Sequence, residues 1–206
     1  MLPRITPIVS TRIRAAFDDR DFVWALKFDG WRCMVYLEKG NCELMSRNGN
    51  TYKSFTRLAK AVAGLKVEDA IIDAEVVCLD GEGKSVFLDL MRKRKAEATL
   101  YAFDLLWHDG EDLRHLPLLG RKRRLQRLLK GQNWCLYAEH FDKGTALFQA
   151  AYDKDLEGVV AKHKLAPYSS TPHSWFKVLN PNYTQKRGRK DLFDKFRERG
   201  AAVSPA

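Results

Sequence analysis

Alternating apolar and polar positions predict that strands dominate this chain. The alternation has a period of two, the period at which strand side chains change face, and turn residues such as Lys-Gly-Asn and Asp-Gly separate its segments. The predicted strands are Phe22–Lys27, Cys33–Glu38, Cys42–Ser46, Ala70–Asp80, Thr99–Trp107, Trp134–Glu139, Leu156–Lys162 and Ser174–Leu179.

Fewer segments show the longer period of a helix, with apolar residues three and four positions apart. The predicted helices are Phe55–Gly64, a short one within 84–97, Leu116–Lys130, Thr145–Lys154 and Gly188–Arg199. Strands and helices do not alternate regularly, which favours an α+β fold with mainly antiparallel sheets flanked by helices.

The length and composition of the chain are typical of one globular domain. It has 206 residues, of which 45% are hydrophobic, so it can bury a core. No apolar run approaches the ~18–20 residues of a membrane span, so no membrane partner is expected. The cysteines form no CxxC pair, which makes a zinc site or a disulfide framework unlikely, and a reducing cytoplasm is the default compartment. They are Cys33, Cys42, Cys78 and Cys135.

Basic residues exceed acidic ones and give a formal net charge of +10. They gather in Arg92–Lys95, in Arg121–Lys130 and in Lys186–Arg199. Such a cationic field attracts polyanions and releases counterions from nucleic acid. The alternative is a set of solvated helix faces, and charge alone does not decide between the two.

The first candidate for chemistry is Lys27, at the end of the strand Phe22–Lys27. It is followed at once by Asp29-Gly30, a turn pair in which glycine accepts a positive φ, and by Arg32. A lysine attacks only when deprotonated, and desolvation with neighbouring cations favours that state. The alternative is a plain hairpin turn with an incidental lysine.

Other polar residues occupy apolar strands or the turns that end them, where unpaired charges are normally excluded. Two carboxylates, Glu75 and Glu157, could hold Mg²⁺, and Asp73 shares a strand face with Glu75. Cations near them could stabilise a transferring phosphoryl group, and an aromatic ring could stack on a base. Alternatively, Glu75 is an ordinary strand acid and the ring fills the core. The cations are Arg47, Lys162 and Lys177, and the ring is Phe103.

Taken in order, these segments resemble the adenylation domain of ATP-dependent DNA ligases, which are covalent nucleotidyltransferases. The similarity is greatest to the ligase domains of bacterial end-joining ligases and covers about residues 20–195. The matching motifs are Lys27-Phe28-Asp29-Gly30 (KxDG) with Arg32, the SRNG of 46–49, Asp73-Ala74-Glu75 (DGE in the family), the YAFDLL of 101–106, the EGVVAK of 157–162, and Trp175-Phe176-Lys177.

The resemblance implies a covalent nucleotidyltransferase fold, described as ATP-grasp-like, that uses ATP with Mg²⁺ or Mn²⁺. Lys27 would form a lysyl–AMP adduct and Phe103 would stack on adenine, while Glu75 and Glu157 would bind the metal. Arg32, Arg47, Lys162 and Lys177 would bind phosphate or ribose. Nicked or broken double-stranded DNA would be the partner, in a bacterial, nucleoid-associated setting. The expected DNA contacts are Arg121, Lys122, Arg123, Arg124, Arg127, Lys186, Arg187, Arg189 and Lys190.

The sequence departs from the family pattern at several positions. Ala25 stands where the family has an acid that reads adenine, and Ala74 replaces the glycine of DGE. Leu179 and Thr171 stand where a lysine and an arginine are expected. The family also continues into an OB-fold domain, and this chain stops about where that would begin. The expectation is a single adenylation domain over 1–206, with a core at 20–182 and a basic helix in 183–206.

Three alternatives to a self-sufficient DNA ligase stay open. The acceptor could be RNA, or the domain could be another nucleotidyltransferase. The departures also fit a degenerate, non-catalytic nucleic-acid-binding module. A third possibility is that a partner protein, such as an end-joining or OB-fold protein, supplies the missing domain.

Overall fold

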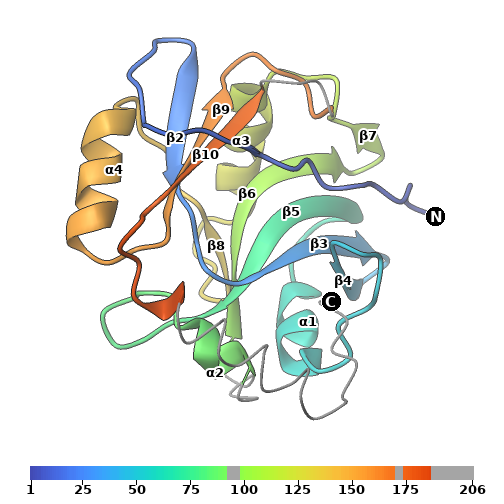
Figure 1. Ribbon diagram of the computed structural model, residues 1–206. Coiled ribbons are helices and arrows are strands. Elements are labelled where there is room, and N and C mark those ends of the chain that lie inside the picture. The colour runs from blue at the N-terminus through green and yellow to red at the C-terminus, as the bar shows by residue number, and fades with distance from the viewer. Residues whose placement is uncertain (92–97, 170–173, 187–206) are drawn as a thin grey trace.

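The computed structural model describes residues 1–91, 98–169 and 174–186. Two sheets face each other, and helices lie on their outer sides (Figure 1). The four-stranded sheet has the order β1 (Thr11–Arg12), β10 (Trp175–Leu179), β9 (Gly158–His163) and β2 (Phe22–Leu26). The six-stranded sheet has the order β4 (Asn41–Ser46), β3 (Trp31–Glu38), β5 (Asp69–Cys78), β6 (Ala98–His108) and β7 (Glu111–Asp112), with β8 (Cys135–Tyr137) also paired to β6.

Antiparallel pairing dominates both sheets, which confirms the predicted fold class. Only β1 with β10 and β6 with β8 are parallel among the pairs of described strands. The predicted strands are present, with ends that differ by a few residues. The two-residue strand β7 was not predicted. It follows a tight turn in which Asp109 and Gly110 both have positive φ, of 48° and 83°.

The helices cover the sheets from outside. Helices α1 (Thr56–Val62), α2 (Phe87–Met91) and α3 (Leu118–Leu128) bury apolar side chains in the main core, on the six-stranded sheet. Helix α4 (Gly144–Asp153) packs on the four-stranded sheet through Leu147 and Ala151. Of the helix predicted within 84–97, only α2 is described, and the helix predicted over Gly188–Arg199 lies outside the described residues.

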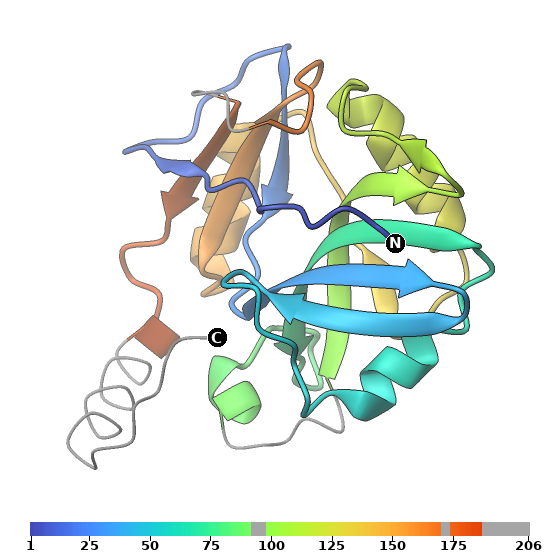
Figure 2. The same ribbon diagram turned by 90° about the vertical axis from the view of Figure 1, so that its right-hand side faces the viewer.

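The N-terminal segment crosses the space between the two sheets (Figure 2). The backbone N–H of Ile5 donates to the hydroxyl of Tyr36 at 3.0 Å, and that of Ile8 to the hydroxyl of Tyr168 at 3.2 Å. Leu2 and Ile8 join a small apolar cluster that includes Trp175 of the four-stranded sheet. The segment therefore ties the sheets together along one side of the space that they enclose.

No helix within the described ranges is both long and apolar enough to cross a bilayer. The four cysteines are free thiols, and Cys33, Cys78 and Cys135 are buried.

Candidate functional site

Strand pairing in the four-stranded sheet brings Lys27 and Glu157 together. The β2–β9 register ends at Leu26 opposite Val159, and the Lys27 backbone N–H then donates to the Gly158 carbonyl at 2.9 Å. Lys27 follows the last residue of β2 and Glu157 precedes the first residue of β9, so the two charged residues lie next to each other. Lys27 Nζ lies 2.6 Å from Glu157 Oε2, with both side chains mostly shielded from solvent.

Glycine is required for steric reasons at two positions near these residues, next to Glu157 and in the loop that follows Lys27. A Cβ on Gly158, whose φ is +147°, would lie 2.1 Å from the Val178 carbonyl. A Cβ on Gly30 would lie 2.2 Å from the Val76 carbonyl. Gly30 is not among the glycines with positive φ, so its predicted use as a positive-φ turn residue is wrong. It is needed because the chain passes close to β5.

The six-stranded sheet supplies the opposite wall. Arg32 of β3 pairs in register with Glu75 of β5, next to Asp73. The residues between and beside the two acids, Ala74 and Val76, enter the main core, so Asp73 and Glu75 share the other face, as predicted. Burial raises the pKa of Glu75 to about 7, although Lys27 and Arg32 oppose the shift. Glu75 is therefore poised to change its charge near neutral pH.

Phe103 reaches the same space because it alternates along β6 with Leu100 and Ala102, which enter the main core, and β6 is bulged just beside it. Between the pairs Ala74–Ala102 and Asp73–Asp104, Phe103 has no partner on β5, and such a bulge re-aims side chains. Arg32 Cζ lies 4.6 Å and Lys162 Nζ 4.1 Å from the centre of its ring.

Lys162 of β9 is a buried cation without an ion-pair partner among the described residues. Its Nζ lies 3.7 Å from the ring centre of Trp175 as well as near Phe103. Burial lowers the pKa of Lys162 well below its ordinary value. A buried, unpaired cation is costly, so this part of the site is suited to an anion.

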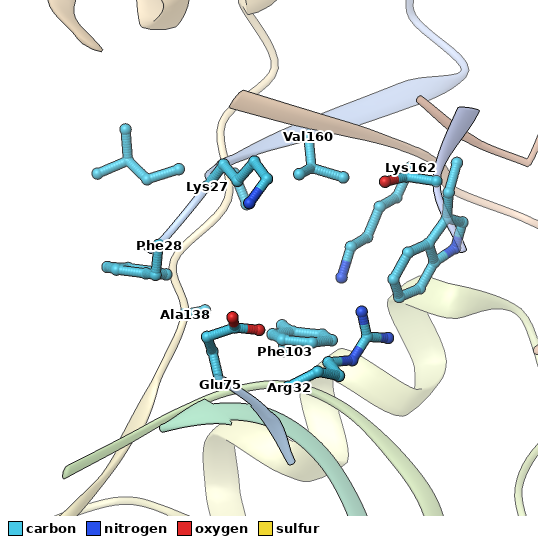
Figure 3. A pocket seen from close by; sticks show the side chains of 12 residues that line it. Lys27, Phe28, Arg32, Glu75, Phe103, Ala138, Val160 and Lys162 are labelled. Carbon is cyan, nitrogen blue, oxygen red and sulfur yellow. The ribbon is translucent and has the colours of Figure 1, made fainter. Parts of the chain in front are cut away.

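These side chains line one pocket between the two sheets (Figure 3). Lys27, Val160 and Lys162 lie on one side, and Glu75, Phe103 and Arg32 on the other. The pocket thus combines cations, one carboxylate and a flat ring facing an aliphatic side chain. Other lining residues are Ser10, Ala25, Leu26, Phe28, Ala138 and Trp175.

Arg47 and Lys177 lie outside this lining. Arg47 is exposed on the turn after β4 and lines a separate groove with residues Arg4–Pro7. Lys177 lies on β10, where burial and the charges of Lys27 and Arg47 lower its pKa, against the influence of Glu157. Neither cation therefore lines the pocket, and after burial it is Lys27 that most influences the pKa of Lys177.

The prediction that Arg121 and Lys122 contact DNA is wrong, because both side chains are buried. Arg121 donates to both oxygens of Asp104, at 2.8 and 2.9 Å. Lys122 Nζ donates to the Ala138 carbonyl at 3.0 Å. Both side chains of α3 therefore stabilise the fold, since they form their hydrogen bonds inside it and not with a ligand at the surface.

The other predicted DNA contacts differ in exposure. Arg123, Arg127 and Lys186 are exposed, whereas Arg124 forms an ion pair with Glu111 at 2.5 Å. Arg187, Arg189 and Lys190 lie outside the described residues, as does Thr171, and so do the basic residues of Arg92–Lys95.

Two residues that sequence reasoning left out of the site hold Arg32 in place. Asp73 accepts from Arg32 Nε and Nη2 at 2.5 Å each, and from the Tyr168 hydroxyl at 2.6 Å. Asp73 stands on the same strand face as Glu75, which was a usable signal. Tyr168 lies in a loop remote in sequence, and no pattern in the chain indicates it.

The chain belongs to the ATP-dependent DNA ligase domain family. The family described as "ATP dependent DNA ligase domain" matches residues 1–178. The multifunctional non-homologous end joining protein LigD of Pseudomonas aeruginosa is 35% identical over 167 residues, which are 77% of this chain and 20% of that protein. The SPbeta prophage-derived DNA ligase-like protein LigB of Bacillus subtilis is 30% identical over 190 residues, 88% of this chain and 69% of that protein.

A solved structure gives the same relationship. Mycobacterial DNA ligase D complexed with ATP and MES superposes with a TM-score of 0.72 at 26% identity, over 84% of this chain and 60% of that one. The chain thus spans about one fifth of the Pseudomonas protein and a larger share of the Bacillus protein and the mycobacterial structure.

Proposed function

We propose that this protein captures AMP from ATP on Lys27 and passes it to DNA during strand sealing. The observation that carries the proposal is the position of the Lys27 amine in a pocket that also contains Glu75, Arg32, Lys162 and Phe103. This set combines a nucleophile, cations for phosphate and a ring for a base.

The first step would be attack of the Lys27 amine on the α-phosphorus of ATP. A P–N bond forms, the bond to the bridging oxygen breaks, and pyrophosphate leaves. The attacking amine must first lose a proton, and Glu157 Oε2, which is hydrogen-bonded to Nζ at 2.6 Å, is positioned to accept it.

The pocket walls would hold the nucleotide. Arg32 and Lys162 would bind phosphate oxygens, and the lack of an ion-pair partner for Lys162 within the described ranges supports this role. Adenine would lie between Phe103 and Val160, which face each other across the pocket (Figure 3). Lys177 and Arg47, which lie outside the pocket lining, would contact the outer phosphates or ribose.

A divalent cation, Mg²⁺ or Mn²⁺, would be held by Glu75 and Glu157. Among the described residues there is no group of three side chains that could form a complete metal cage. Two carboxylates are nevertheless a donor set that fits Mg²⁺, which commonly takes its other ligands from water and substrate phosphates. When bound, such an ion would neutralise phosphate charge.

The adenylate would then pass to the 5′-phosphate of a nick, and the 3′-hydroxyl would displace AMP and seal the strand. The exposed Arg123, Arg127 and Lys186 remain candidates for contacts with the DNA backbone. An end-joining partner protein and a cytoplasmic, nucleoid-associated setting are part of this proposal, supported by the likeness to LigD.

The proposal is tested by incubating the protein with ATP labelled at the α-phosphate and with Mg²⁺ or Mn²⁺, followed by a denaturing gel. We expect label on the wild type and none on Lys27→Ala. Lys60→Ala, which changes an exposed lysine of α1, is the matched control and should label normally. Label on Lys27→Ala would exclude Lys27 as the nucleophile.

Adding an acceptor distinguishes the alternatives. Sealing of nicked DNA but not of nicked RNA supports a DNA ligase, whereas the opposite preference indicates an RNA ligase. DNA binding without any adenylate on the wild type would indicate a non-catalytic nucleic-acid-binding module and contradict the proposal.

A further inference from the structure

The segment Asn180–Gln185, which follows β10, connects the two loops that carry Lys27 and Glu157. We call this segment the strap. Asn180 and Tyr183 within it are buried, although it forms no strand. Its side chains point to partners remote in sequence, so its position is set by specific hydrogen bonds.

Asn180 and Thr184 of the strap hold the loop before β9. The Asn180 backbone N–H donates to the Glu157 carbonyl at 2.9 Å, and its side-chain amide donates to the Leu156 carbonyl at 3.0 Å. Thr184 donates from its backbone N–H to Asp155 Oδ1 at 3.0 Å and from its hydroxyl to Asp155 Oδ2. These bonds position the backbone from which Glu157 reaches Lys27.

Tyr183 and Gln185 of the strap hold the loop after β2, the second of them through Ser85. The Tyr183 hydroxyl donates to Asp29 Oδ2 at 3.0 Å, and Asp29 is buried. The Asp29 backbone N–H donates to Ser85 Oγ at 3.2 Å, and Gln185 Nε2 donates to the Ser85 carbonyl at 2.9 Å. Lys27 is two residues before Asp29, so its backbone is fixed on both sides.

We propose that Tyr183 is a positioning residue for the adenylation step, and that the strap aligns Lys27 with Glu157. This inference rests on the proposed function. Burial and the adjacent Asp29 raise the pKa of Tyr183, so its hydroxyl stays protonated and remains a donor. Tyr183 does not line the pocket, so it acts on the reaction only through Asp29 and the loop of Lys27.

The expected effect is on the rate of reaction and not on ATP binding, because the residues that would bind ATP stay in place. Misplacement of a reacting group by about 1 Å can cost ~100-fold in rate. Loss of one hydroxyl that holds the loop should cost less, and we expect about a tenfold slower adenylation.

The test is single-turnover labelling of the full chain with ATP labelled at the α-phosphate, over a range of ATP concentrations. Tyr183→Phe is compared with Tyr36→Phe, which removes another hydroxyl that is hydrogen-bonded within the fold but lies outside the pocket. Three quantities are measured: the rate constant at saturating ATP, the half-saturating ATP concentration, and the fraction of molecules finally labelled.

Support requires a rate constant about tenfold lower in Tyr183→Phe, with the other two quantities within about twofold of wild type. A rate equal to that of Tyr36→Phe, or a loss only in the labelled fraction, overturns the inference. If Tyr183→Phe does not fold, Gln185→Ala decides: a rate about threefold lower supports the strap, and a wild-type rate overturns it. Failure of the wild type to label contradicts the proposed function itself.

Discussion

Two Arg–Asp pairs lie side by side in this protein, and they differ in how completely the fold encloses them. Asp73 of β5 and Asp104 of β6 are direct cross-strand partners, and each is neutralised by its own arginine. Arg32 binds Asp73 and keeps 21% of its side chain exposed, in the pocket. Arg121 binds Asp104, and both of these side chains are 0% exposed. The same kind of ion pair thus lines a pocket in one place and is enclosed in the fold, as a structural joint, in the other.

The difference lies in what surrounds each guanidinium. Arg121 also donates to the carbonyls of Leu116 and Ala166, so its hydrogen-bonding groups are used within the fold. Arg32 lines the pocket beside Phe103 and Glu75, where a ligand can reach it. A buried charge is expensive unless it is paired, so removing either arginine has a cost, but of the two arginines only Arg32 lines the pocket.

The largest expected effect on stability comes from Arg121→Ala. It leaves Asp104 buried without its cation, which should lower the free energy of unfolding by about 3–5 kcal/mol. Chemical denaturation measures the loss. Arg121→Met combined with Asp104→Leu should recover most of it, since no charge is then left unpaired. A loss below about 1 kcal/mol for Arg121→Ala would show that the pair is not a structural joint.

Lys122→Met, on the same helix, tests how the burial of one lysine makes the free energy of unfolding depend on pH. Burial lowers the pKa of Lys122 to about 8, from an ordinary value of about 10.5. Between these values the unfolded chain binds a proton that the folded chain does not, so this group makes the free energy of unfolding rise with pH. Its contribution across that window is about 3 kcal/mol.

Urea denaturation of wild type and Lys122→Met at pH 8 and above checks this prediction. The wild type should gain stability with pH relative to the variant. If the free energy of unfolding changed with pH in the same way for both proteins over that window, Lys122 would have to stay protonated in the folded state.

The smallest effect on stability is expected from Arg32→Ala. The free energy of unfolding should fall by about 1–2 kcal/mol, because Asp73 keeps its bond to Tyr168 and the pocket admits water. Labelling by ATP should instead fall about 100-fold, as for the loss of a preorganised group that stabilises charge. The comparison between the two pairs fails if Arg32→Ala labels normally. It also fails if Arg121→Ala, measured at the same concentration of folded protein, labels as poorly as Arg32→Ala.

Lys27 and Glu157 could be located from sequence because they lie at strand ends. The alternation predicts two strands, Phe22–Lys27 and Leu156–Lys162, which put Lys27 at the end of one and Glu157 near the start of the other. The side-chain period of two then predicts that Asp73 and Glu75 share a face. The bulge beside Phe103, which leaves this residue without a partner on β5, has no such local signal, since it depends on how β6 pairs with β5.

By itself, the sequence determined most of the described elements to within a few residues, the mainly antiparallel class and the family, through short-range periodicity and ordered motifs. Only the tertiary structure decided which cations are available. Arg121 and Lys122 belong to a basic run, yet both are buried and form hydrogen bonds to Asp104 and to the Ala138 carbonyl. The hydrogen bond from the Tyr183 hydroxyl to Asp29 likewise joins residues that are remote in sequence. Each of these partners lies far along the chain, and local pattern carries no information about which remote group will satisfy a buried charge.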